Sequence, residues 1–323
     1  MENDLYLSDN ILNGFEAFEY TLDGMTYPKL YHHLYNLIPK ADIKFDFFNR
    51  ETLIACEIIC AAICHKINWD FLRKAIYEKT IKQPEWIEPF NLATITVDEV
   101  FDILSEYEKK DRIMEQERCE LLWDIGNSIM KFPGGYEEIF FEDSSKYLKD
   151  FNKICAFFKK CDVFVSDPQQ KKLQLLFQSL SDYEEYKYLA KFYRPTIDYH
   201  LIRLFLRRGV VKPVTQLALE YVFNNEATRR ENTIATLRKV CADSLDTLSW
   251  LTSLDLKDVN RIEWWIGRTI CINGTPDCDL KSKESEWLKP YFAKCPYYEC
   301  CYARQCDHKF LEISEPTYKG TSY

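Results

Sequence analysis

Apolar residues recur at three- and four-residue spacing along most of the chain, which is the pattern of helices with one buried face. The segment from Thr52 to Trp69 is one example, and its apolar stripe consists of Leu53, Cys56, Ile59, Cys60 and Ile63. Further helices are predicted over Thr96–Lys109, Lys109–Phe132, Phe151–Lys160, Glu231–Leu251 and Val259–Ile270. No convincing ladder of alternating strand positions accompanies them, so the predicted fold class is mainly α.

Capping residues predict where several of these helices begin and end. Thr96 is a suitable N-cap, and Asp167-Pro168 is a strong start signal for a helix through Leu180. Thr196 is predicted to cap the next helix, which ends at Gly209. Pro133-Gly134-Gly135 is the strongest breaker in the chain.

Composition narrows the classes of function. The chain has 323 residues, of which 15% are aromatic, so it is too rich in core-forming side chains for a disordered protein. Only 9 residues are glycine, which argues against a dinucleotide-binding fold. The net charge of −9 argues against a non-specific grip on duplex DNA, because phosphate contacts require basic surface. No apolar run is long enough to predict a membrane span.

The chain contains 13 cysteines, and its first ten residues lack the basic region of a signal peptide. We therefore expect an intracellular protein, in which clustered cysteines indicate metal binding rather than a disulfide framework. Cys56, Cys60 and Cys64 lie on the apolar helix face and are interpreted as core residues.

The cysteines near the C-terminus have the spacing of a metal site. Six residues separate Cys271 from Cys278, and five separate Cys295 from Cys301. Thiolates placed at the end of a helix and along the following loop can hold a [4Fe-4S] cluster. Zinc is the alternative, although structural zinc favours two tight cysteine pairs. Cys300 and Cys306 remain alternatives to Cys301.

Two motifs resemble the helix-hairpin-helix DNA glycosylases of the endonuclease III type. Gly267-Arg268-Thr269-Ile270-Cys271 and the cysteines after it resemble their cluster loop, with 16 residues between Cys278 and Cys295 where the family has two. Pro195 to Arg203, closing at Gly209, resembles the segment that carries their catalytic carboxylate, which maps to Asp198. The family's glycine-rich DNA-binding hairpin has no counterpart, since residues 179–194 contain no glycine.

Other segments are similar to queuosine-salvage proteins, the queuosine 5′-phosphate N-glycosylases. These segments are Thr94–Val100, the helix with Glu117-Arg118, Phe132–Gly135, Lys171–Leu176 and Asp198-Tyr199-His200. That family resembles the glycosylase core without the hairpin and is not expected to carry a cluster. The resemblances imply a two-lobed, all-helical glycosylase-like fold. The corresponding division is an N-terminal segment 1–50, a core 51–270, a cluster loop 271–310 and a tail 311–323.

The resemblance also implies a chemistry. Cleavage of an N-glycosidic bond passes through a cationic sugar, which a carboxylate such as Asp198 stabilises. Lys171 or Lys172 is a candidate nucleophile or phosphate contact, and candidate substrate contacts are His200, Trp264 and Trp265. Without the resemblance, the sequence context favours a helix N-cap or first-turn role for Asp198 over a catalytic one.

Three hypotheses follow. The first is a hydrolase of the base–sugar bond in a modified nucleotide or nucleoside of the queuosine type, favoured by the acidic chain and the missing hairpin. The second is a DNA base-excision glycosylase. The third is a non-catalytic module that binds nucleic acid or a partner and keeps the cluster as a structural element.

Overall fold

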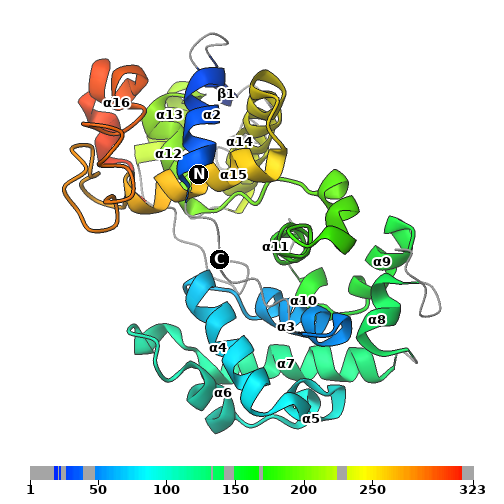
Figure 1. Ribbon diagram of the computed structural model, residues 1–323. Coiled ribbons are helices and arrows are strands. Elements are labelled where there is room, and N and C mark those ends of the chain that lie inside the picture. The colour runs from blue at the N-terminus through cyan, green and yellow to red at the C-terminus, as the bar shows by residue number, and fades with distance from the viewer. Residues whose placement is uncertain are drawn as a thin grey trace, which may run out of the picture. The chain divides into compact units, whose positions relative to one another are not determined.

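The chain is mainly helical, as the apolar periodicity predicted (Figure 1). The computed structural model describes residues 18–20, 22, 27–38, 48–131, 134–141, 149–166, 170–223 and 231–314. Within these residues the strands are β1 (Phe18–Tyr20) and β2 (Val211–Pro213), which pair antiparallel with Phe18 opposite Pro213. This short ribbon was not predicted, because three-residue strands are too short to show a period.

The chain divides into two compact units. Unit 1 contains the described residues of Met1–Lys40 and Arg194–Lys319, and unit 2 contains those of Ala41–Tyr193. The predicted core 51–270 therefore includes residues of both units, and the N-terminal segment contributes β1 and α2 (Tyr27–Leu37) to unit 1. Asp198 and the four candidate cysteine ligands belong to unit 1, whereas Lys171 and Lys172 belong to unit 2.

Unit 2 is a set of helices around one apolar core. Its α-helices are α3 (Arg50–Ala62), α4 (Trp69–Lys82), α5 (Pro89–Thr94), α6 (Val97–Leu104), α7 (Glu115–Met130), α8 (Gly135–Phe140), α9 (Phe151–Phe158), α10 (Asp162–Val165) and α11 (Lys171–Leu180). The 3₁₀ turns are η1 (Pro84–Ile87), η2 (Lys110–Arg112) and η3 (Glu184–Phe192). The predicted cap at Thr96 is confirmed, since its hydroxyl accepts from the Glu99 N–H and the Glu99 carboxylate accepts from the Thr96 N–H.

Two features fix the interior of unit 2. A Cβ at Gly126 would lie 2.5 Å from the Ala93 nitrogen, so only glycine allows α5 and α7 to approach as closely as they do. The buried Glu57 carboxylate accepts from the Arg73 guanidinium at 2.6 Å and from the Ser179 hydroxyl at 2.6 Å, with a further bond from Tyr77. This network ties α4 and α11 to α3.

Unit 1 contains α2, β1, β2, α12 (Tyr199–Arg208), α13 (Gln216–Phe223), α14 (Glu231–Thr252), α15 (Leu256–Thr269) and α16 (Tyr302–Gln305). It also contains the 3₁₀ turns η5 (Tyr298–Cys300) and η6 (His308–Glu312). Helix α2, drawn in blue in Figure 1, packs against α14 and α15. The contact includes a buried hydrogen bond from the Tyr31 hydroxyl to Glu263, which also pairs with Arg208 of α12.

Several predicted boundaries were wrong. The helix expected over Thr52–Trp69 ends at Ala62, and Asn68 caps α4. The helix expected from Lys109 begins at Glu115, because Met114 adopts a left-handed conformation with φ of 49°. The apolar stripe continues across both breaks, so periodicity alone does not reveal them.

Other boundaries were correct or lie outside the described residues. Gly209 ends α12 in a left-handed conformation with φ of 73°, as predicted for a C-cap glycine. Pro133 and the Asp167-Pro168 start signal fall outside the residues that the structure describes. Within those residues, no helix has both the length and the apolar character that crossing a bilayer requires.

Candidate functional site

Asp198 is the N-cap of α12, and its carboxylate accepts hydrogen bonds from α12 and α15. Its Oδ1 accepts from the His200 N–H at 2.9 Å and the Leu201 N–H at 3.1 Å, and its Oδ2 accepts from the Trp264 Nε1–H at 3.1 Å. The prediction that Thr196 caps this helix was wrong, since the Thr196 hydroxyl instead accepts from Asn260. Asp198 is 5% exposed, so only a narrow part of the residue reaches the protein surface.

The side chains next to Asp198 come from α12 and α15. The His200 Nδ1 lies 3.2 Å from Arg203 Nη2 and accepts from it, because a guanidinium only donates. The Arg268 guanidinium lies 4.8 Å from the centre of the Trp264 ring, in a cation–π arrangement. Of the three predicted substrate contacts, Trp264 touches the carboxylate with its side chain and His200 with its backbone N–H.

The close approach of α12 and α15 depends on Gly267. A Cβ at this position would lie 3.0 Å from the carbonyl oxygen of His200, so a larger residue would push the two helices apart. Trp265, the third predicted contact, is half-buried and packs edge-on against Trp287. Its surroundings are those of a core residue.

Lys171 and Lys172 begin α11 in unit 2, where Lys172 is buried and Lys171 is half-buried. Since Asp198 lies in unit 1, nothing in the arrangement of either unit brings these lysines and the carboxylate into one site. Their predicted roles as nucleophile or phosphate contact stay predictions.

The four predicted cysteine ligands lie close together in unit 1. Negative charges on Cys271, Cys278 and Cys301 would each raise the pKa of the Cys295 thiol, which burial already raises strongly. Burial likewise raises the pKa of Cys301 to about 11, with contributions from Cys271 and Cys278. Cys301 is partly buried and has this proximity, whereas Cys300 and Cys306 are exposed.

Three arginines surround this group of cysteines. Arg203 Nε donates to the Cys271 carbonyl at 2.7 Å, and Arg207 Nη1 lies 3.7 Å from the Cys271 sulfur. Arg304 Nε lies 3.3 Å from the Cys278 sulfur. Cationic N–H donors aimed at sulfur stabilise thiolates, and thiolates are the form that binds metal. The donor set therefore fits a thiolate-bound metal group.

Zinc and a cubane cluster make different demands on their cysteine ligands. Among the described residues, no three or more His, Cys, Asp or Glu side chains are arranged to hold a single metal ion. Four ligands of one zinc ion must converge on one atom, whereas a cubane distributes its four thiolates over four irons.

The other clustered cysteines are core residues, as predicted for Cys56 and Cys60. Both are fully buried in α3, and burial raises the pKa of Cys56 to about 12.

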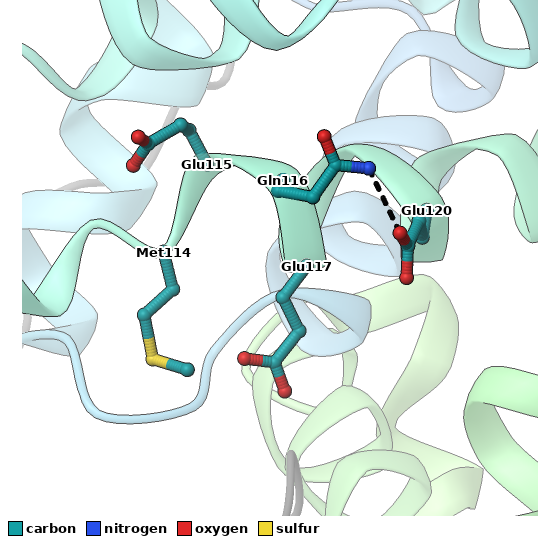
Figure 2. A pocket seen from close by; sticks show the side chains of 5 residues that line it. All are labelled: Met114, Glu115, Gln116, Glu117 and Glu120. Atoms are coloured by element: carbon teal, nitrogen blue, oxygen red, sulfur yellow. Dashed lines mark hydrogen bonds between the residues drawn. The ribbon is translucent and has the colours of Figure 1, made fainter.

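Unit 2 has a shallow depression at the start of α7. Figure 2 shows its lining side chains, Met114, Glu115, Gln116, Glu117 and Glu120, with Gln116 donating to Glu120 at 2.8 Å. Three carboxylates make this depression acidic. None of its residues was predicted as a functional site.

Sequence reasoning missed the arginines that organise unit 1. Arg203 and Arg207 are 0% and 1% exposed, and their donors bind the carbonyls of Gly267, Cys271, Ile272, Gly274 and Ile313. Arg203 lies inside the apolar run Leu201–Leu206, and Arg207 follows it four residues later on the same helix face. This spacing was the available signal, because such positions face a core. Asp277 carried no comparable signal. Its carboxylate accepts from the Ser282 N–H and the Ser285 hydroxyl, and these bonds hold the start of the segment between Cys278 and Cys295.

Comparison with protein-family models finds no match to this chain, and comparison with curated proteins finds none either.

Proposed function

We propose that this protein is an N-glycosidase that hydrolyses the base–sugar bond of a modified nucleotide or nucleoside. The observation that supports the proposal is the Asp198 carboxylate, oriented at the head of α12 beside Trp264 and His200. An oriented carboxylate next to an indole is a suitable arrangement for binding a base and stabilising a sugar cation.

The proposed chemistry assigns one role to each group. The bond between the sugar C1′ and the base nitrogen breaks, and the electron pair leaves with the base. The Asp198 carboxylate stabilises the resulting positive charge and accepts a proton from the water that attacks C1′. The base takes up a proton from solvent or from His200. Trp264 holds Asp198 in place and offers an aromatic contact to the base.

The substrate class is proposed because the chain lacks two features that favour DNA binding, a basic charge and a glycine-rich hairpin. The net charge of −9 and the absence of glycine from residues 179–194 both favour a small nucleotide of the queuosine type. A DNA base-excision glycosylase is the second candidate. The Gly267-Arg268-x-x-Cys271 helix end, with its grouped cysteines, favours that alternative.

Incubation of the purified protein with queuosine 5′-monophosphate and, separately, with duplexes that contain damaged bases tests both candidates. We expect chromatography to detect free base from the nucleotide and no release from the duplexes. Release from the duplexes alone would replace the first candidate by the second. No release from either set would favour a non-catalytic binding module.

We further propose that Cys271, Cys278, Cys295 and Cys301 hold a [4Fe-4S] cluster in an intracellular protein, where thiols stay reduced. Arg207 and Arg304 donate toward the sulfurs of Cys271 and Cys278, which supports a thiolate-bound group here. The cluster would fix the loop after α15 against α12, a structural role.

Anaerobically purified protein is expected to contain about four irons per chain. Cys301→Ser should lose most of this iron, because it removes one of four ligands. Cys306→Ser, an exposed cysteine in the same loop, is the matched control and should keep it. Elemental analysis provides the measurement; stoichiometric zinc without iron, or iron lost only from the Cys306 variant, would contradict the assignment.

A further inference from the structure

The orientation of the Trp264 indole depends on contacts outside the apolar core of unit 1. Trp265 and Trp287 pack against that core, whereas Trp264 is not among the described side chains that do so. The Trp264 ring is half-buried and meets the Trp265 ring edge-on, with the two ring centres 5.7 Å apart. Its Nε1–H donates to Asp198 Oδ2 at 3.1 Å. Because core packing does not fix this ring, the remaining contacts decide where its N–H points.

Arg268 provides one of these contacts. It follows Trp264 by four residues in the last turn of α15, so the two side chains lie on the same face of the helix. The Cζ atom of its guanidinium lies 4.8 Å from the centre of the Trp264 ring and 5.8 Å from that of the Trp265 ring. The cation therefore lies close to both indoles and restricts the movement of Trp264.

Partial burial of the guanidinium strengthens this contact. Arg268 is half-buried, and its Nη1 is buried without a hydrogen-bond partner among the described residues. A buried donor without an acceptor is unfavourable, and the negative faces of indole rings compensate part of the charge. The attraction between a cation and an aromatic ring increases as the cation loses its hydration. Movement of the Trp264 ring away from Arg268 would therefore cost free energy.

We propose that Arg268 is a positioning residue that acts on the Asp198 carboxylate through Trp264. With the indole restricted, its N–H stays directed at Oδ2, while two backbone N–H groups of α12 bind Oδ1. Donors on both oxygens fix the orientation of the carboxylate before the reaction, which favours stabilisation of a transition state. The catalytic consequence rests on the proposed glycosidase activity, whereas the restriction of Trp264 is measurable without a substrate.

Two substitutions separate the charge of Arg268 from its size. Arg268→Met keeps a long, unbranched side chain but removes the cation. Arg268→Lys keeps a cation but not the planar guanidinium, so it should restore the function in part. Arg261→Met is the matched control, because it removes an arginine of the same helix that pairs with Asp258. Thermal unfolding verifies that each variant is folded.

The first measurement requires no substrate. The indole N–H resonance of Trp264, in the full chain labelled with ¹⁵N at tryptophan, is assigned by its loss in Trp264→Phe. We expect this N–H to exchange with solvent at least ~10-fold faster in Arg268→Met than in the wild type, because a weakened hydrogen bond opens more often. Arg268→Lys should lie between the two, and Arg261→Met should match the wild type. Equal exchange in Arg268→Met and the wild type would overturn the proposal.

The second measurement is base release from the nucleotide. Arg268→Met should lower kcat ~10-fold and leave KM within about twofold, because orienting the carboxylate affects bond cleavage more than substrate binding. A raised KM with unchanged kcat would mean that Arg268 contacts the substrate directly, and would also overturn the proposal. If the wild type releases no base, the glycosidase assignment fails, and the exchange rates alone decide whether Arg268 restricts Trp264.

Discussion

Replacing Asp198 with asparagine is expected to reduce base release ~100-fold or more while leaving the protein folded. Asparagine caps helices as well as aspartate, so the bonds from the His200 and Leu201 N–H groups persist. The negative charge that would stabilise the sugar cation is lost. The substitution therefore separates the proposed catalytic role of the carboxylate from its role as a helix cap.

Two further variants complete this test. Asp198→Ala removes cap and charge together, and should lower the free energy of unfolding by about 1 kcal/mol in addition to abolishing release. Trp264→Phe keeps the charge but removes the indole donor to Oδ2, so it should reduce release less than Asp198→Asn does. Initial rates and thermal unfolding of the three variants give the comparison. Release at the wild-type rate by Asp198→Asn would leave the carboxylate with its capping role alone.

The fold class could be predicted from the sequence because one apolar stripe recurs through most helices. The positions at which the helices break within that stripe could not be predicted from the sequence. At Met114 the chain leaves the helical conformation although the apolar pattern continues. Thr196 is a residue type that caps helices well, but Asp198 is the residue that caps α12. Such choices depend on partners from distant segments, as when Asn260 donates to Thr196.

The candidate site could be predicted in part. Sequence spacing predicted which cysteines would group together, and the chain folds so that these residues approach one another. They are Cys271, Cys278, Cys295 and Cys301.

Removing one member of the buried ion pair in unit 1 is expected to destabilise that unit strongly. Arg208→Met would leave the fully buried Glu263 carboxylate with Tyr31 as its remaining donor. An uncompensated buried charge costs about 3–5 kcal/mol in the free energy of unfolding. The Arg208 guanidinium also lies 3.5 Å from the Tyr297 ring centre, two residues after Cys295, so its loss should loosen the cysteine loop. Urea denaturation followed by circular dichroism measures the change.

The triple variant Tyr31→Phe/Arg208→Met/Glu263→Leu distinguishes a lost charge partner from damaged packing. In the wild type, Arg208 Nε, Arg208 Nη2 and Glu263 Oε2 have no hydrogen-bond partner among the described residues, so the pair is incompletely satisfied. Apolar side chains of similar volume remove every charge at once, and such replacements are often neutral or stabilising. We therefore expect stability within about 1 kcal/mol of the wild type, or above it. A triple variant as unstable as Arg208→Met would mean that the shape of Arg208 against Tyr297, rather than its charge, holds α12 to the cysteine loop.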